Sequence, residues 1–271
     1  MTTMTTVFQN RPKHELATNN LWCFLYEQGL RKAIFHQLDR ILSVINAEFK
    51  KGNLTHECIS RIRSWFADDF LRETVHGRGF MKPNGYPGDY LFLDRIYTRH
   101  VSKNPEYRIW DEYVQQHAAP NAVRNRKEYF KELILERANR RAGLDLLNVV
   151  SGSGRELCEM YKQLPTKNVY TTCVEIDEKA IAFSKELNID HQEYIKYMHS
   201  NIFKFRNKKT YDMIWCAGLF DYLNDKAFVF LLKKFKDWLS PNGEIVIGNY
   251  NEEFNPSRDY LEILGDWQLI H

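Results

Sequence analysis

The sequence lacks the features that mark secreted, membrane-spanning and metal-binding chains. Its five cysteines are scattered, without a CxxC pair or a metal-ligand spacing, which favours a reducing compartment and predicts no metal site. The polar N-terminal segment has no apolar stretch typical of a secretion signal. No apolar run reaches the roughly 18 residues of a membrane span. These absences predict a cytoplasmic protein without a membrane-spanning segment.

An excess of charge of one sign is also missing. The net charge is only +3, and Lys and Arg are interleaved with Asp and Glu, so no basic run indicates a nucleic-acid partner. Aromatic residues, in contrast, make up 14% of the chain. They either pack a helical layer or line a pocket for an apolar or flat ligand, and the sequence leaves both interpretations open.

The first half of the chain has the apolar spacing of helices. Apolar residues recur every three or four positions over 34–49 and again over 59–70, which predicts two helices, with Thr55 as the cap of the second. Further helices are expected over about 105–116 and 122–141. The stretch 76–89, HGRGFMKPNGYPGD, holds four glycines and two prolines, so we expect it to be irregular. Irregular segments of this length are usually functional or disordered, and its aromatic residues argue against disorder.

The second half alternates short apolar strands with helices. This alternation predicts an α/β fold with a doubly wound, mostly parallel sheet. Helices are expected at 180–187 and 226–239. The expected strands are 146–150, 169–174, 194–198, 211–216, 244–248 and, at the end of the sequence, 267–271.

A glycine-rich turn follows the first of these strands and opens a helix. It consists of Ser151, Gly152, Ser153 and Gly154. Glycines let the backbone approach a ligand closely, and the helix N-terminus beyond them offers N–H groups to a carboxylate or phosphate. Leu157 stands where a dinucleotide-binding G-x-G-x-x-G pattern has its third glycine, which disfavours NAD.

Polar residues at the ends of the next two strands complete a candidate site for an adenosine group. Glu175 ends the second strand, where a carboxylate can accept both hydroxyls of a ribose. Capping of the next helix is the alternative role, and it fits Asp177 better than Glu175. After the third strand, the amide of Asn201 can hydrogen-bond an adenine edge while Ile202 packs on its face.

In this order, and with the segments 211–223 and 238–247, the set resembles class I S-adenosylmethionine (SAM) dependent methyltransferases over residues 144–271. The resemblance implies a Rossmann-like sheet and SAM as the cofactor. Asn148 and Val150 depart from the family pattern, which usually has an acidic residue and a glycine there, and both departures affect the methionine end of the site. The implied cofactor-binding residues are Ser151, Gly152, Ser153, Gly154, Glu175, Ile176, Asn201, Ile202 and Ala217.

Three further segments, 82–90, 122–126 and 217–223, are similar to a bacterial subgroup that includes 3-hydroxy fatty acid methyl ester synthases, which make quorum-sensing signals. This resemblance implies a small-molecule methyl acceptor, with the carboxyl group of an apolar acid as the expected one. Two other readings stay open. In one, the chain is an O- or N-methyltransferase of an aromatic natural product. In the other, it is a non-catalytic SAM-binding subunit completed by a partner chain.

The predicted organisation is an N-terminal helical cap, residues 1–141, on a SAM-binding domain, residues 142–271. The loop 76–90 is the expected lid, and Tyr86, Asp89 and Tyr222 are the candidate catalytic residues. For Asp89 the alternative role is to cap the helix that follows.

Two more pairs of side chains are weaker candidates. His76 and His117 are candidate bases, and Arg124 and Arg126 are candidate ligands of a carboxylate. Surface or capping positions are the alternative for all four.

The end of the sequence suggests an open sheet edge. The family normally adds a seventh, antiparallel strand, and no residues remain for it after residue 271. An open edge in that position is an aggregation hazard. We therefore expect either a truncation or a partner chain or second copy that covers the edge.

Overall fold

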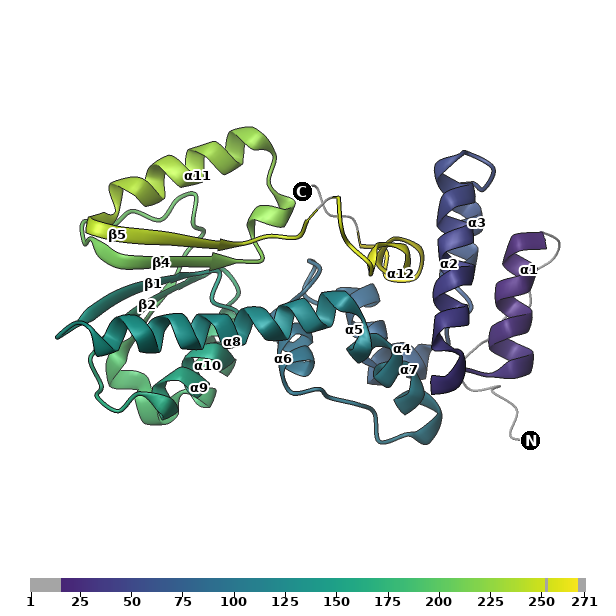
Figure 1. The fold of residues 1–271 in the computed structure, drawn as a ribbon, viewed down its shortest axis with the longest axis horizontal. Coiled ribbons are helices and arrows are strands. Elements are labelled where there is room, and N and C mark those ends of the chain that lie inside the picture. Colours follow the sequence, from purple (N-terminus) through teal and green to yellow (C-terminus); the bar gives the residue numbers. More distant parts are fainter. Residues whose placement is uncertain (1–15, 252, 268–271) are drawn as a thin grey trace. The chain divides into compact units, whose positions relative to one another are not determined.

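The computed structural model describes residues 16–251 and 253–267. They form two compact units, which are described separately: a helical unit of residues up to 122 together with 255–267, and a sheet unit that begins at residue 123 and ends at residue 254 (Figure 1). The division falls inside helix α8 (Ala118–Asn139). The predicted roles of cap and cofactor domain stay predictions.

Short amphipathic helices build the helical unit. In α2 the apolar residues Phe35, Leu38 and Leu42 share the buried face. The expected cap of α3 is confirmed, because the Cys58 N–H donates to Thr55 Oγ1 at 3.3 Å. The helices are α1 (Leu16–Cys23), α2 (Phe35–Lys50), α3 (His56–Arg63), α4 (Asp68–Glu73), α5 (Val75–Met81), α6 (Tyr90–Tyr97), α7 (Pro105–Gln116), the first turn of α8, and α12 (Arg258–Ile263), with short η1 (Phe24–Gln28) and η2 (Lys32–Ile34).

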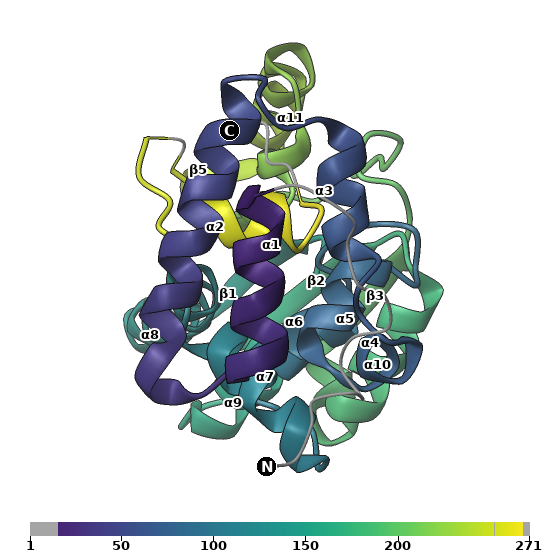
Figure 2. The same cartoon turned by 90° about the vertical axis from the view of Figure 1, so that its right-hand side faces the viewer.

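Helix α12 belongs to the helical unit although it follows the sheet in sequence. It packs against α2, as Figure 2 shows, where the yellow helix lies behind the purple ones. The Asn46 amide on α2 donates to Asp259 Oδ1 at 2.7 Å and to Glu262 Oε2 at 2.9 Å on α12. These bonds tie the C-terminal helix to the start of the chain.

The prediction of an irregular segment at 76–89 was wrong for its first part, which forms α5. Thr74 caps this helix by accepting the Gly77 N–H at 3.0 Å, and Lys82, at φ 47°, ends it. A Cβ atom at position 77 would overlap the backbone of Leu71, so this glycine permits close packing of two helices and not a turn. The irregular segment begins only at residue 82.

Aromatic side chains form much of the core of the helical unit. Trp65, Phe70, Trp110 and Tyr113 are fully buried. Their rings meet largely edge to face, as between Phe70 and Trp110, whose centroids are 5.6 Å apart. In this unit the packing-layer interpretation of the aromatic content therefore fits these residues.

The sheet unit confirms the predicted α/β fold. Its five described strands are all parallel, in the order β3-β2-β1-β4-β5, and helices cover both faces (Figure 1). The strands are β1 (Leu144–Val149), β2 (Val169–Glu175), β3 (Ile195–His199), β4 (Tyr211–Ala217) and β5 (Leu239–Gly248); the helical elements are the rest of α8, α9 (Arg155–Gln163), α10 (Glu178–Leu187), η3 (Ile189–Tyr194), η4 (Phe220–Tyr222) and α11 (Asp225–Asp237).

Alternating side chains of β1 serve two cores. Leu146 joins the cluster on the face that α8 and α9 cover, whereas Leu147 joins the cluster on the face of α11. Burial on both faces explains why the strand reads as a continuous apolar run in the sequence. The chain leaves β1 toward β2 on one side and reaches β4 on the other, so the order of strands reverses at β1.

Two predictions concern the limits of the described chain. The strand expected at 267–271 falls mostly outside the described residues, and β5 is one edge of the described sheet. Within the described residues, no helix is long and apolar enough to cross a membrane. The cytoplasmic location stays a prediction.

Candidate functional site

The carboxyl ends of the parallel strands bring most of the predicted cofactor residues to one edge of the sheet. Val149, the last residue of β1, pairs with Val174 on β2 and with Cys216 on β4. The glycine turn, Glu175 and Ala217 follow directly after these three positions. Open α/β sheets bind their ligands at this edge, at the point where the strand order reverses.

Glu175 is the best-defined polar group at this edge. It is 3% exposed, and its Oε2 accepts the Gly152 N–H at 2.9 Å. Its Oε1 accepts the N–H groups of Ile176 and Asp177 at 2.8 and 3.1 Å. Burial raises the pKa of Glu175, while these three bonds act in the opposite direction. A carboxylate has about four acceptor positions, so one remains for a ligand hydroxyl.

Of the two acids Glu175 and Asp177, Asp177 caps the next helix. Its Oδ1 accepts the Lys179 N–H at 2.8 Å and thereby caps α10. Glu175 takes no part in that cap. The two neighbouring carboxylates therefore bind different groups: Asp177 binds the N-terminus of α10, and Glu175 binds the glycine turn at the edge of the sheet.

The two glycines of the turn have different surroundings. Both have positive φ angles, 53° at Gly152 and 63° at Gly154. A Cβ atom at position 152 would meet nothing within 4 Å, whereas one at position 154 would overlap the Ser184 hydroxyl on α10. Gly152 thus borders open space, and Gly154 allows α9 and α10 to pack closely.

The two serines of the turn are both buried. Ser151 is 4% exposed and Ser153 is 2% exposed. Ser153 Oγ has no hydrogen-bond partner within the described part of the chain. Buried hydroxyls normally have a partner, so this group is suited to bind a ligand atom.

Val150 carries the backbone conformation that glycine would adopt without strain. Its φ is 55°, and a β-branched residue in this region is an outlier that costs on the order of 1–3 kcal/mol. Its N–H donates to the Val174 carbonyl at 2.8 Å, which holds the turn against β2. Val150 therefore keeps the turn conformation that a glycine would adopt, at the cost of backbone strain.

The second departure, Asn148, lies beside a buried carboxylate. Its Nδ2 donates to Glu156 Oε1 at 3.2 Å, and both side chains are buried. Burial raises the pKa of Glu156, whereas the positive charge of Arg126 favours its ionised form. An acidic group is thus present next to position 148, supplied by the first turn of α9.

The residues predicted to contact adenine differ in their exposure. Asn201 Oδ1 accepts the Phe203 N–H at 2.9 Å and closes the turn after β3, while Ile202 is buried in the core. Ile176, in contrast, is 56% exposed directly after Glu175. Of the two isoleucines, Ile176 has the apolar surface that a base could cover. The adenine contacts of all three residues stay predictions.

Arg126 extends from α8 over the ends of β4 and β5. A Cβ atom at Gly218 would lie 3.4 Å from its Nη1, and one at Gly248 would lie 3.1 Å from its Cδ. Ala217, predicted to bind the cofactor, is half-buried at the end of β4 beside them. The two glycines leave the room that the arginine occupies.

The pair Asp221 and Tyr222 follows β4 in η4. Asp221 is buried and accepts the Tyr250 N–H at 2.6 Å, which joins η4 to the segment after β5. Tyr222 is half-buried. Its predicted catalytic role stays a prediction.

Asp89 and Tyr86 lie in the helical unit. Asp89 accepts Arg78 Nε at 2.9 Å and Arg78 Nη2 at 2.8 Å, the Asn84 amide at 3.2 Å and the Phe92 N–H at 2.8 Å. These four bonds occupy its acceptor positions and cap α6, which favours the capping role. Tyr86 is half-buried in the turn before it. The lid and the catalytic roles stay predictions.

The candidate bases of the helical unit are enclosed by rings. His76 Nδ1 lies 2.7 Å from the Tyr260 hydroxyl, and burial lowers the pKa of His76 to about 3. Burial also lowers the pKa of His117, with the charge of Asp39 acting in the opposite direction. Burial thus disfavours the protonated form of both imidazoles.

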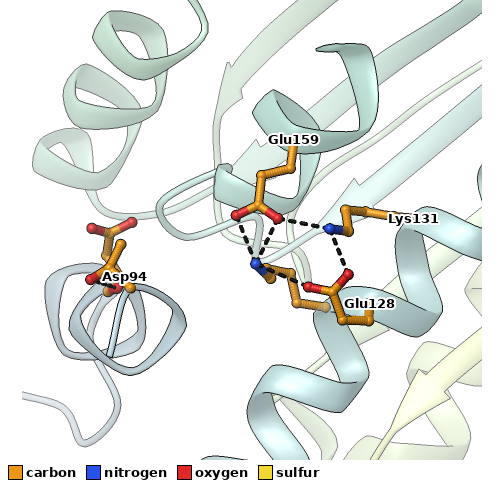
Figure 3. A network of polar contacts seen from close by, with 6 residues as sticks. Asp94, Glu128, Lys131 and Glu159 are labelled. Atoms are coloured by element: carbon orange, nitrogen blue, oxygen red, sulfur yellow. Dashed lines mark hydrogen bonds and ion pairs between the residues drawn. The ribbon is translucent and has the colours of Figure 1, made fainter. Parts of the chain in front are cut away.

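An ion network that the sequence analysis missed holds α8 against α9. Glu159 on α9 receives Lys127 Nζ at 2.6 Å and Lys131 Nζ at 2.8 Å, and Lys131 also contacts Glu128 at 2.6 Å (Figure 3). Burial acts to raise the pKa of Glu159, but the two ammonium groups outweigh it and lower the pKa. The network fixes the helix that begins at the glycine turn. The spacing of Lys127 and Lys131 on one helix face was the available signal.

Comparison with known families identifies the sheet unit. Residues 146–243 match the model of a methyltransferase domain. This part of the chain has the Rossmann-like fold of a methyltransferase domain. The predicted methyltransferase domain is confirmed over these residues, and SAM is the cofactor that the resemblance implies. The more specific quorum-signal subgroup stays a prediction.

Solved structures with the same fold include a possible exported protein from Bordetella parapertussis. It is 24% identical, with a TM-score of 0.53, and the match covers 66% of this chain and 59% of that one. The chain thus spans less than two thirds of that relative's length. The N-methyltransferase NodS from Bradyrhizobium japonicum, in complex with S-adenosylhomocysteine, is 17% identical, with a TM-score of 0.40, over 58% of this chain and 71% of NodS. No curated protein matches the chain.

Proposed function

We propose that the chain binds SAM at the carboxyl edge of the sheet and transfers its methyl group to a small molecule. The observation that carries the proposal is the Glu175 carboxylate, buried at the tip of β2 and fixed by three backbone N–H groups, with one acceptor position left. This position suits a ribose hydroxyl. The domain match supports the same cofactor.

Different neighbouring residues would bind the methionine end and the adenine of SAM. The open side of Gly152 admits the methionine end, where the buried Ser153 hydroxyl is ready to form a hydrogen bond. The exposed side chain of Ile176 covers one face of the adenine. When bound, SAM would supply a methyl group on a sulfonium sulfur, which an acceptor atom could displace in line. The protein's part is to position the acceptor and exclude water.

For the acceptor we propose the carboxyl group of an apolar acid, which gives a methyl ester. The similarity of 82–90, 122–126 and 217–223 to fatty acid methyl ester synthases supports it. So does the state of the candidate bases, since Asp89 has its acceptor positions occupied and burial lowers the pKa of His76 to about 3. A carboxylate is already ionised at pH 7 and needs no base.

The test is a set of acceptors incubated with SAM and analysed by mass spectrometry. The set contains 3-hydroxy fatty acids, phenols and amines, and mild alkali then distinguishes esters, which hydrolyse, from methyl ethers and methylamines, which do not. We expect an alkali-labile methyl ester as the main product. An alkali-stable phenol or amine product would instead establish the O- or N-methyltransferase alternative.

A second candidate function is a SAM-binding subunit that does not catalyse transfer alone. It is favoured by the strained Val150 and the neutral Asn148 at the methionine end. A partner chain or second copy would then pair with β5, an edge of the described sheet. Methyl transfer by the isolated chain, shown to be monomeric by light scattering, would rule this candidate out.

A further inference from the structure

The sheet unit contains a second hollow, separate from the cofactor edge. Its volume is about 470 Å³, and it is lined by parts of β2 and β3 and by the segment 205–209 before β4. It includes none of the predicted cofactor residues. Thr172, in its lining, is three residues before Glu175, a separation of about 10 Å along an extended strand.

An unusual crossover creates this hollow. The side chains of Tyr170 and Thr172 on β2, and of Lys196 and Met198 on β3, belong to the sheet face that α11 covers farther along, over β4 and β5 (Figure 1). The connection from β3 to β4, residues 200–210, contains no helix. A crossover helix normally covers such a strip of a parallel sheet, and here an irregular segment leaves it open.

The hollow is strongly cationic. Lys196, Arg206, Lys208 and Lys209 line it, with Glu193 as the one carboxylate. Lys209 is paired with Asp145, whereas the other three cations form no ion pair with any described residue. The hollow therefore has uncompensated positive charge.

A neighbouring lysine adds to this charge. Lys234 on α11 donates to the carbonyls of Ile202 and Phe203 at 2.9 and 2.8 Å. Burial lowers the pKa of Lys234, and the charge of Arg206 lowers it further. Cations that repel one another in this way are relieved by a bound anion.

The remaining lining is suited to a flat group. The ring of Tyr170 is 50% exposed, and its centroid lies 6.3 Å from that of Tyr194. The lining also includes Met198, Phe205 and Tyr211, which belong to the core of the unit. A hollow lined by both an exposed ring and a planar guanidinium offers stacking together with bidentate binding of phosphate.

We propose that this hollow binds a small phosphate-bearing ligand with a flat ring, of the nucleotide class. The phosphate groups contact Arg206, Lys196 and Lys208, and the ring lies against Tyr170. A cavity of this volume holds a small molecule, which favours a nucleotide over a polymer. The inference is independent of the methyl acceptor, because no residue of the cofactor edge takes part.

The test is calorimetric titration with ATP in the presence of saturating S-adenosylhomocysteine, which occupies the proposed adenosine site at the sheet edge, with adenosine as the uncharged probe. We expect ATP to bind and adenosine not to bind, and the affinity for ATP to fall as salt is raised. Arg206→Gln and Lys208→Gln should each weaken ATP binding about five- to tenfold, because each removes a charged donor. Lys226→Gln, an exposed lysine of α11 outside the hollow, is the matched control and should leave the affinity unchanged.

A further variant separates this hollow from the cofactor edge. In Glu175→Ala, ATP affinity should equal that of the unsubstituted chain, because the hollow is intact. Loss of ATP binding in Glu175→Ala, unchanged binding in both Arg206→Gln and Lys208→Gln, or no binding of ATP at all would each overturn the proposal. Much tighter binding of a single-stranded oligonucleotide than of ATP would also overturn it, in favour of a polynucleotide partner.

Discussion

Two buried acids of the helical unit and two buried polar groups at the edge of the sheet unit differ in the hydrogen bonds that they make. In the helical unit, four donors fill the acceptor positions of Asp89, and Asp111, fully buried, accepts the N–H groups of Val75 and Ser102 at 2.7 and 2.8 Å. At the edge of the sheet unit, Glu175 and Ser153 are equally buried but retain free capacity to accept or donate. Saturated groups hold a fold together, whereas groups with capacity left are suited to a ligand.

The largest expected effect separates the two glycines of the turn. Gly154→Ala should lower the free energy of unfolding by about 3 kcal/mol, because its Cβ would overlap the Ser184 hydroxyl in addition to the strain of a positive φ. Gly152→Ala should cost only about 1 kcal/mol, since its Cβ meets nothing. It should still weaken SAM binding, because the added methyl group enters the open space. Urea unfolding and calorimetry measure the two effects. Equal losses of stability would contradict the division of roles.

The next prediction concerns the pH dependence of stability that the buried carboxyl group of Asp111 causes. Burial raises the pKa of Asp111 to about 6, while its two backbone bonds act in the opposite direction. Its pKa in the folded state is thus above the unfolded value, so the folded state binds more protons between about pH 4 and 6. Stability should therefore fall as pH rises through this window, by about 2–3 kcal/mol from this group alone.

Asp111→Asn provides the comparison for that measurement. This variant should lose stability because an amide has only one oxygen for the two N–H groups, but its free energy of unfolding should no longer contain this pH-dependent contribution. The measurement is urea unfolding at intervals from pH 4 to 7. The same slope in both proteins would show that Asp111 is not the titrating group.

The smallest expected effect concerns Val150. In Val150→Gly the release of backbone strain offsets the lost side-chain packing and the greater freedom of the unfolded chain, so stability should change by less than about 1 kcal/mol. Its neighbour Val149 is fully buried with ordinary strand geometry, and Val149→Gly should cost about 3 kcal/mol. A similar loss in both variants would mean that Val150 is not strained.

The sheet was predictable from the sequence because its strands are buried on both faces. The expected strands at 169–174 and 211–216 each end one residue before the observed β2 and β4. The position of Glu175 at a strand tip follows from this pattern, whereas the strand order comes from the structure. The division of work between Glu175 and Asp177 was also expected from their positions in the sequence.

Features that depend on distant contacts were not predictable. The helix at 75–81 was missed because Gly77 reads as a turn until the backbone of Leu71 is placed beside it. Gly154 was assigned to the cofactor alone, since nothing in the local sequence indicates that Ser184 lies against it. The burial of Ile202 in the core depends likewise on α11. Each of these is set by packing between elements and not by local pattern.

The most direct test of the account is the affinity of Glu175→Ala for SAM, measured by calorimetry beside Asp177→Ala. Glu175 lies at the carboxyl edge of the sheet and Asp177 caps α10, so the two neighbouring acids form a matched pair. We predict that Glu175→Ala weakens SAM binding by about 1–3 kcal/mol, whereas Asp177→Ala leaves it nearly unchanged and lowers only stability, by about 1 kcal/mol. Unchanged SAM affinity in Glu175→Ala, or an equal loss in both variants, would contradict the assignment of this edge as the cofactor site.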